Sequence, residues 1–359
     1  NDIFNQLIKK SEYHKRKKEI QKFNDKQKVL KKGISITPIK FGISFTTTHL
    51  NQAGALVHIY TDGSVHLNHG GIEMGQGLMT KLAQITSHEL GLSYEFIKIT
   101  STDTEKVPNT SASAASATTD LNGGAIINAI YKLKSNLNNF IYDHYNVKSI
   151  IRYENDYVHF DKRKITFKEL ISKAYLNRVS LSSSGFFKTS KIDINTKTLK
   201  GRPFLYFTYG AAVSEVIVDT LTGENKLLQV DIIHDVGNSI NKRIDKGQIE
   251  GGFIQGLGWL TTEEISWRKD GNILTHSPST YKIPTAGETP FKLNVEIYKS
   301  GFNKEEVVNR SKAVGEPPFM LAISSFTAIK DAVFNANKKK GSANLIAPAT
   351  PENILKSIY

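Results

Sequence analysis

The sequence contains no cysteine in its 359 residues. This absence excludes disulfide bonds, thiolate-bound zinc and iron–sulfur clusters held by cysteine from this chain, so any cluster relay must lie elsewhere. The sequence also lacks an apolar run of about 18 residues, which excludes an ordinary membrane-spanning helix. The first ten residues, NDIFNQLIKK, mix charged and amide side chains where a secretory signal would be apolar. We therefore expect a cytoplasmic protein.

The composition is that of a soluble globular chain long enough for about two domains, with 39% hydrophobic and 23% charged residues. The chain begins with Asn rather than Met, which suggests a processed chain or a piece of a longer protein. The net charge is +13, and residues 1–33 hold eleven Lys or Arg against four Asp or Glu. Such a patch can bind nucleic acid or another anionic surface. Because interleaved aromatic residues are missing here, we instead predict a basic helix that docks on a larger partner, and no nucleic-acid or membrane partner.

Two stretches share one order of elements. GALVHIYTDGSVHLNHG predicts two strands joined by a turn at Asp62-Gly63, followed by a glycine-rich loop and a helix that Gly91 closes. GAAVSEVIVDTLTGENKLLQVDIIHDVG repeats strand, turn and strand, and a loop containing GQIEGG leads into the helix-like FIQGLGWL. We therefore predict an α+β fold of two lobes, built from repeated hairpin–loop–helix units with mixed sheets packed against helices.

Three segments rich in small residues are candidate ligand loops. GGIEMGQG places Gly75, Gln76 and Gly77 at a helix start, where free N–H groups and the helix dipole favour anions, although a tight turn explains it equally well. NTSASAASATTDLNGG precedes a second helix, with Asp120 as a candidate cap; composition alone favours a linker. KGQIEGGFIQGLGW puts Gln248 in the place that Gln76 takes in the first unit. Three such loops together favour one large polar ligand.

One carboxylate stands directly before two prolines in KAVGEPPF. Because proline disfavours helical geometry in the preceding residue, Glu316 is predicted to lie on an extended segment at the entrance of a helix over FMLAISSFTAIKDAVF. A structural cap is the ordinary interpretation of such a glutamate. A residue aimed at a ligand is the alternative.

The motifs HGGIEMGQGLMTK, VPNTS with AAS and DLNG, GQIEGGFIQGLG and KAVGEPPF occur in the order found in the molybdopterin-binding part of the xanthine dehydrogenase/oxidase family of molybdenum hydroxylases. The chain resembles the second, C-terminal half of that part from about residue 12 to APATPENIL near its end. FGISFT resembles xanthine dehydrogenase rather than aldehyde oxidase. The resemblance implies a molybdenum–molybdopterin cofactor held through the pterin, with no direct metal ligand from the protein.

The resemblance also implies roles for individual residues. Glu316 matches the family's catalytic base, which activates a molybdenum-bound hydroxyl, and the substrate contacts match Phe45 and Thr46. His49 departs from the family, where an apolar aromatic is usual, and this departure bears on the substrate channel. The residues similar to cofactor contacts are Gly75, Gln76, Gly77, Ala114, Ala115, Ser116, Thr118 and Gln248.

The implied reaction is the hydroxylation of hypoxanthine and xanthine to urate, with water as the oxygen source. The first half of the molybdenum domain and the [2Fe-2S] and FAD domains are absent from this sequence, so we expect them on partner domains or chains, in a dimer of the complete assembly. Alternatives are a related molybdenum hydroxylase acting on aldehydes or another N-heterocycle, and a non-catalytic scaffold. The electron acceptor, NAD or oxygen, stays open because it reacts at the flavin.

These interpretations divide the chain into four parts. A basic connecting helix is expected over 1–33, and a first α+β lobe with two cofactor loops over 34–140. A polar, irregular connecting region with one short helix is expected over 141–200. The second α+β lobe, over 201–359, carries the third cofactor loop and the catalytic glutamate.

Overall fold

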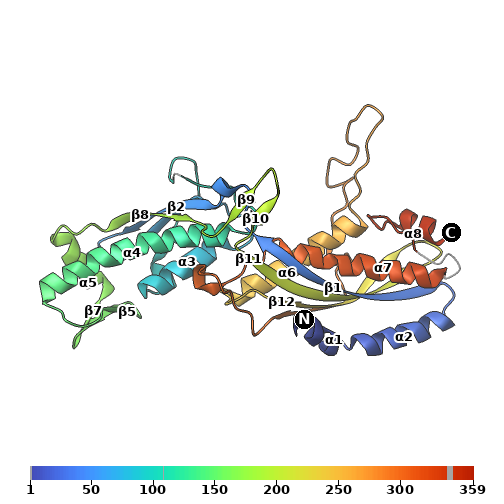
Figure 1. Ribbon diagram of the computed structural model, residues 1–359, viewed down its shortest axis with the longest axis horizontal. Helices are drawn as coiled ribbons and strands as arrows, with labels where there is room; N and C mark the ends of the chain where they lie inside the picture. The colour runs from blue at the N-terminus through green and yellow to red at the C-terminus, as the bar shows by residue number, and fades with distance from the viewer. Residues whose placement is uncertain (1, 108, 338–342) are drawn as a thin grey trace.

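The computed structural model describes residues 2–107, 109–337 and 343–359. Position 108 of the VPNTS motif, and small parts of the predicted segments 1–33 and 201–359, therefore lie outside the described residues. The molecule is elongated, with a lobe at each end of the long axis (Figure 1). We call them lobe A, built on the sheet that contains β2, and lobe B, built on the sheet that contains β11. The predicted mixed α+β fold is confirmed.

Lobe A is a four-stranded sheet in the order β4-β3-β2-β8 with helices against it. Its hairpin turns at Gly63, whose φ of 88° favours glycine, as the sequence predicted. Helix α4 packs so closely on β8 that a Cβ on Gly185 would lie 1.9 Å from the carbonyl oxygen of Ala125. The elements are β2 (Gln52–Ile59), β3 (Val65–His69), α3 (Leu78–Leu90), β4 (Ile97–Ile99), α4 (Thr118–Tyr145) and β8 (Ser182–Lys188).

Lobe B is a second four-stranded sheet in the order β1-β11-β12-β13, with helices on both sides. The hairpin β11–β12 turns at Gly223, with φ 78°, again as predicted. Helix α7 lies along β1, where a Cβ on Gly33 would lie 1.9 Å from the carbonyl oxygen of Ala328. The elements are β1 (Leu30–Ile43), β11 (Tyr206–Asp219), β12 (Asn225–His234), α6 (Lys242–Thr261), β13 (Lys292–Ile297), η5 (Pro317–Ala322), α7 (Ile323–Ala336) and α8 (Pro351–Ile358).

The basic N-terminal segment forms two helices, α1 (Asp2–Lys10) and α2 (Tyr13–Lys26), rather than the single helix predicted. The chain changes direction at Glu12, whose φ is 50°. The segment docks on lobe B itself, on the side of the sheet opposite α7 (Figure 1). Arg16 reaches the sheet, with its Nη1 2.7 Å from Asp231 Oδ2 and its Nε 2.9 Å from Glu215 Oε2. Part of the positive charge is therefore neutralised internally.

The sheets differ from the predicted boundaries in two places. The boundary between 33 and 34 falls inside β1, which pairs with β11 over its whole length and so belongs to lobe B. The region 141–200 contains the predicted short helix, but it also supplies β8 to the sheet of lobe A and a small sheet of its own. Strand pairing joins segments far apart in sequence, which a division by local composition cannot detect. The elements are β5 (Arg152–Glu154), β6 (Tyr157–Phe160), β7 (Arg163–Thr166) and α5 (Phe167–Leu176).

The remaining elements are short, and an irregular arm of about residues 262–291 projects from lobe B (Figure 1). Within the parts of the chain that the structure describes, no helix is long and apolar enough to cross a membrane. The short elements are η1 (Thr48–Leu50), η2 (Tyr94–Phe96), β9 (Asp193–Asn195), β10 (Lys200–Arg202), η3 (Ala286–Glu288) and η4 (Val308–Arg310).

Candidate functional site

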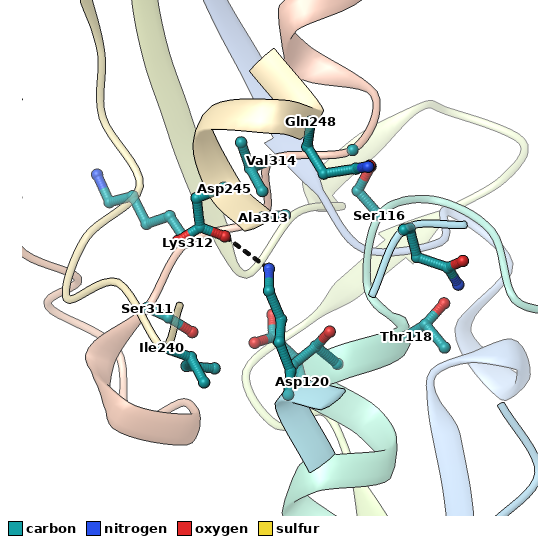
Figure 2. Close-up of a pocket in the computed structure, with 14 residues that line it drawn as sticks. Ser116, Thr118, Asp120, Ile240, Asp245, Gln248, Ser311, Lys312, Ala313 and Val314 are labelled. Carbon is teal, nitrogen blue, oxygen red and sulfur yellow. Dashed lines mark hydrogen bonds and ion pairs between the residues drawn. The ribbon is translucent and has the colours of Figure 1, made fainter. Parts of the chain in front are cut away.

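A pocket lies between the two lobes, where the start of α4 faces α6 and the segment 311–315 (Figure 2). Its volume is about 80 Å³, well below the roughly 300–1,000 Å³ of typical small-molecule sites, so it can receive only part of a large ligand. The lining residues are Gln76, Lys81, Ser116, Thr118, Thr119, Asp120, Ile240, Asp245, Gln248, Ser311, Lys312, Ala313, Val314 and Gly315. All three predicted ligand segments contribute to it.

The first loop is stabilised by hydrogen bonds between its own residues. The side chain of Gln76 accepts from the Met74 N–H at 2.6 Å and donates to the Ile72 carbonyl at 2.7 Å. Several of the N–H groups predicted to be free at the start of α3 are already bound. The carboxylate of Glu73 accepts from the amides of Gly75, Gly77 and Met79 at 2.9–3.0 Å. Sequence reasoning missed Glu73, although an acidic residue just before a helix is a known signal for such a contact.

The second loop presents Ser116 to the glutamate segment. Ala115 and Ser116 both have φ of 52°, a left-handed conformation that costs energy in residues other than glycine and often marks functional sites. Ser116 Oγ donates to Glu316 Oε2 at 3.1 Å and accepts from the Glu316 N–H at 2.8 Å. Thr118 begins α4 and lines the pocket. The predicted cap Asp120 lies inside the first turn instead, and the residue before the helix is Ala117.

The third segment is helical, which corrects the prediction of a loop. GQIEGG lies inside α6, whose N-cap Asn241 accepts from the Ile244 N–H at 3.0 Å. Its glycines allow close packing: a Cβ on Gly256 would lie 2.4 Å from the carbonyl oxygen of Phe319. Gln248 is half-buried and lines the pocket, and its side-chain amide has no hydrogen-bond partner among the described residues. Helix α6 therefore carries a free amide into the pocket and packs Gly252 and Gly256 against the segment after Glu316.

Glu316 is exposed and lies directly before η5. The prediction that it would be extended is wrong, because its φ of −81° and ψ of −38° are helical. Its carbonyl accepts from the Phe319 N–H at 3.0 Å. The local preference imposed by Pro317 is thus overridden by this turn and by the two bonds to Ser116. Glu316 does not cap a helix with its side chain.

Two side-chain pairs at the pocket were not predicted from the sequence. Lys81 Nζ lies 2.6 Å from Asp245 Oδ1, with side chains only 10% and 4% exposed, and so ties α3 of lobe A to α6 of lobe B. Asp120 Oδ2 accepts from the Tyr206 hydroxyl at 2.6 Å. Burial raises the pKa of the Asp120 carboxyl to about 6, while that hydrogen bond and the charge of Lys81 act to lower it. Both pairs join residues more than 80 positions apart, and local sequence carries no signal for them.

The predicted substrate residues lie beyond the end of β1. Phe45 is half-buried, and its backbone exchanges two hydrogen bonds of 2.9 Å with the side chain of buried Asn51. Thr46 and His49 are exposed. None of the three lines the pocket described above. Their predicted role remains a proposal.

The pocket's donor set suits an organic cofactor. Within the described residues no group of three or more His, Cys, Asp or Glu is close enough to hold a metal ion. The charged lining residues are already bound to partners, Lys81 to Asp245, Lys312 to Asp235 and Asp120 to the Tyr206 hydroxyl. The other polar side chains that line the pocket from the three segments are neutral amides and hydroxyls, which both donate and accept hydrogen bonds. Such groups match the mixed donors and acceptors along the edge of a pterin. The free amide of Gln248 and the left-handed turn at Ser116 are the clearest signs of a ligand that completes the site.

Comparison with known proteins gives one family and several relatives. Residues 6–290 match the family described as the molybdopterin cofactor-binding domain. The chain is 46% identical over 358 residues to the xanthine dehydrogenase/oxidase of Felis catus, with 97% of this chain and 25% of that protein covered. It is 42% identical to xanthine dehydrogenase 2 of Arabidopsis thaliana, with 99% of this chain and 26% of that protein covered. The chain therefore spans about a quarter of the length of these curated relatives.

Solved structures share the fold at lower identity. Quinoline 2-oxidoreductase from Pseudomonas putida 86 superimposes with a TM-score of 0.85 at 21% identity, over 99% of this chain and 45% of that one. Aldehyde oxidoreductase from Desulfovibrio gigas superimposes with a TM-score of 0.77 at 22% identity, over 99% of this chain and 35% of that one. At these identities the likeness extends to the fold alone.

Proposed function

The chain belongs to the molybdopterin cofactor-binding domain family, and from this premise we propose that it is the second half of the molybdenum catalytic domain of a xanthine dehydrogenase. The observation that carries the proposal is the pair of hydrogen bonds by which Ser116, a pocket-lining residue of one cofactor segment, holds Glu316, the residue after the pocket-lining Gly315. The relatives that cover nearly the whole chain support the choice of substrate.

The proposed reaction hydroxylates hypoxanthine and xanthine to urate with water as the oxygen source. Each step replaces a ring C–H bond by C–OH and releases two electrons and two protons. When bound, the molybdenum–pterin group supplies the oxidant that takes up the two electrons. Glu316 accepts the proton given up by the attacking oxygen, which is general-base catalysis. Ser116 donates to Oε2 of this carboxylate, and no described residue hydrogen-bonds to Oε1. Oε1 is therefore available to accept the proton.

The cofactor would be held by groups from three segments. The candidates with side chains in the pocket are Gln76, Ser116, Thr118 and Gln248, and the backbones of Gly75, Gly77, Ala114 and Ala115 shape the two loops. The side chain of Gln76 already forms two hydrogen bonds within its own loop. It would therefore contribute to cofactor binding by fixing the shape of the loop and through its remaining N–H. Phe45 and Thr46 are proposed to contact the flat substrate.

The rest of the enzyme lies outside this sequence. The first half of the molybdenum domain would complete the cofactor and substrate sites, and [2Fe-2S] and FAD groups on other domains or chains would carry the electrons away. The complete assembly is proposed to be a cytoplasmic dimer. Because Glu316 is exposed in this chain, the absent half would also have to exclude water from the site.

The test uses the complete protein that contains this chain. Urate formation from xanthine and molybdenum content are measured for the wild type and Glu316→Gln. We expect activity to fall by about 10²- to 10⁴-fold, the usual worth of a general base, with molybdenum retained. Glu306→Gln is the control, since that side chain is 85% exposed. An unchanged rate in Glu316→Gln would refute the base, and a molybdenum-loaded wild type that oxidises aldehydes but not xanthine would refute the substrate.

A further inference from the structure

The segment that carries Glu316 is held by side chains of β11. The Ala313 N–H donates to the hydroxyl oxygen of Tyr206 at 3.1 Å, and the Ala313 carbonyl accepts from the Thr208 hydroxyl at 3.2 Å. One residue earlier, the Lys312 N–H donates to the Val236 carbonyl at 2.8 Å. Both backbone groups of Ala313, three residues before Glu316, are therefore bound to hydroxyl groups of a neighbouring strand.

The hydroxyl of Tyr206 also reaches the second cofactor segment. It donates to Asp120 Oδ2 at 2.6 Å, and Asp120 lies in the first turn of α4, four residues after Ser116. Because the hydroxyl hydrogen points to this carboxylate, an oxygen lone pair faces the Ala313 N–H. One hydroxyl thus joins the helix behind the Ser116 loop to the segment of Glu316.

The environment of Tyr206 favours a fixed geometry. Tyr206 is 6% exposed and Thr208 is fully buried, and Tyr206 does not itself line the pocket. A hydrogen bond to a buried carboxylate is stronger than one between neutral groups. Burial and the neighbouring Asp120 both raise the pKa of the Tyr206 phenol, so it stays a donor at all ordinary pH values.

We propose that Tyr206, oriented by Asp120, is a positioning residue for Glu316: together with Thr208 it fixes the backbone of Ala313, and so the distance between the glutamate and the Ser116 loop. The proposal rests on the proposed function, in which Glu316 is the base. It does not require Tyr206 to touch substrate or cofactor. Since a base must lie within hydrogen-bond reach of its proton, a shift of less than 1 Å along this segment matters for the rate.

The test compares Tyr206→Phe with Tyr153→Phe in the complete protein. Tyr206→Phe removes only the oxygen atom and keeps the ring in the core. Tyr153 is a matched control, because its hydroxyl donates to Asn138 Oδ1 at 2.8 Å in lobe A, away from Glu316. The first readout is hydrogen–deuterium exchange of the peptide covering residues 312–316. The second is kcat and KM for xanthine, with molybdenum content measured alongside.

We expect faster exchange at 312–316 in Tyr206→Phe but not in Tyr153→Phe, and a kcat lowered about 10- to 100-fold with KM and molybdenum nearly unchanged. Thr208→Val, which frees the Ala313 carbonyl, should act in the same direction; it serves as the decisive variant if Tyr206→Phe does not fold. Unchanged exchange and kcat, or equal losses in Tyr153→Phe, would overturn the proposal. If exchange rises as expected while Glu316→Gln keeps its rate, Tyr206 does hold the segment 312–316, and the proposal that Glu316 is the base is refuted.

Discussion

Ser116 and Glu316, 200 residues apart in sequence, are joined by two hydrogen bonds through a single hydroxyl oxygen. Ser116 Oγ accepts from the backbone N–H of Glu316 and donates to its carboxylate, so the serine sets both the position of the residue and the direction of its side chain. Because Ser116 lies in a left-handed turn of lobe A and Glu316 lies before η5 of lobe B, this contact ties the glutamate to the relative placement of the lobes.

Replacing Ser116 by alanine should therefore loosen Glu316. Each lost hydrogen bond is worth about 1 kcal/mol, so we expect kcat to fall about tenfold or more in the complete enzyme. Ser111→Ala is the control, because Ser111 lies in the same segment and its side chain has no hydrogen-bond partner among the described residues. Steady-state rates with xanthine, normalised to molybdenum, provide the measurement. Equal rates for the two variants would contradict the role given to Ser116.

The Lys81–Asp245 ion pair should contribute strongly to the stability of the lobe interface. Lys81→Met leaves the Asp245 carboxylate nearly buried without its cation, which typically costs about 3–5 kcal/mol. The exposed pair Lys246–Glu250, 3.7 Å apart, is the control, and Lys246→Ala should cost less than about 1 kcal/mol. Chemical denaturation of the complete protein measures both. A loss no larger in Lys81→Met than in Lys246→Ala would show that the interface does not depend on this pair.

Replacing either of two glycines of α6 by alanine should change the stability of the protein, in opposite directions. A Cβ on Gly256 would lie 2.4 Å from the Phe319 carbonyl oxygen and 2.8 Å from the Ala322 Cβ, so Gly256→Ala should destabilise the protein by about 1–3 kcal/mol. A Cβ on Gly251 would meet nothing within 4 Å, and alanine there should stabilise the helix by about 0.5–1 kcal/mol. Thermal unfolding of both variants tests the packing of α6 on η5. The same sign of change in both would contradict it.

His234 should make the protein less stable in acid. It is fully buried, and neither ring nitrogen has a hydrogen-bond partner among the described residues. Burial, with a smaller contribution from nearby Lys312, itself paired with Asp235, lowers its pKa to about 3. Between pH 6.5 and 3 the unfolded chain therefore binds a proton that the folded protein does not, so this contribution to stability is lost as the pH falls.

At pH 5 that loss amounts to about 2 kcal/mol relative to pH 7. His234→Leu removes the titrating group and the two unpaired nitrogens, so its free energy of unfolding should fall less between pH 7 and pH 5 than that of the wild type. His88→Gln is the control, because the His88 side chain is 86% exposed. Denaturation curves at pH 7 and pH 5 measure the free energy of unfolding of each variant. Parallel pH dependence of wild type and His234→Leu would rule this explanation out.

Local features of the sequence were sufficient for the repeated units. Gly63 and Gly223 mark the two hairpins because both adopt positive φ, and Gly91 ends α3 for the same reason. The apolar spacing after Thr118 predicted a helix, and α4 is there. These features depend on neighbours a few residues away, so the order of amino acids is enough to specify them. The motifs around Gln76, Ser116, Gln248 and Glu316 were likewise visible in the sequence.

Only the tertiary structure decided how those parts meet. GQIEGG is helical although glycine disfavours helices, and Gly252 within it, with Gly256 one turn later, lets α6 approach the segment 315–319 closely. Glu316 is helical in spite of Pro317 because Ser116 and the turn into η5 hold it. Tyr206 and Asp120 form a hydrogen bond although they are 86 residues apart in sequence. Close packing and hydrogen bonds between distant segments outweigh local preferences of about 1 kcal/mol per residue, and that balance exists only once the two lobes have come together.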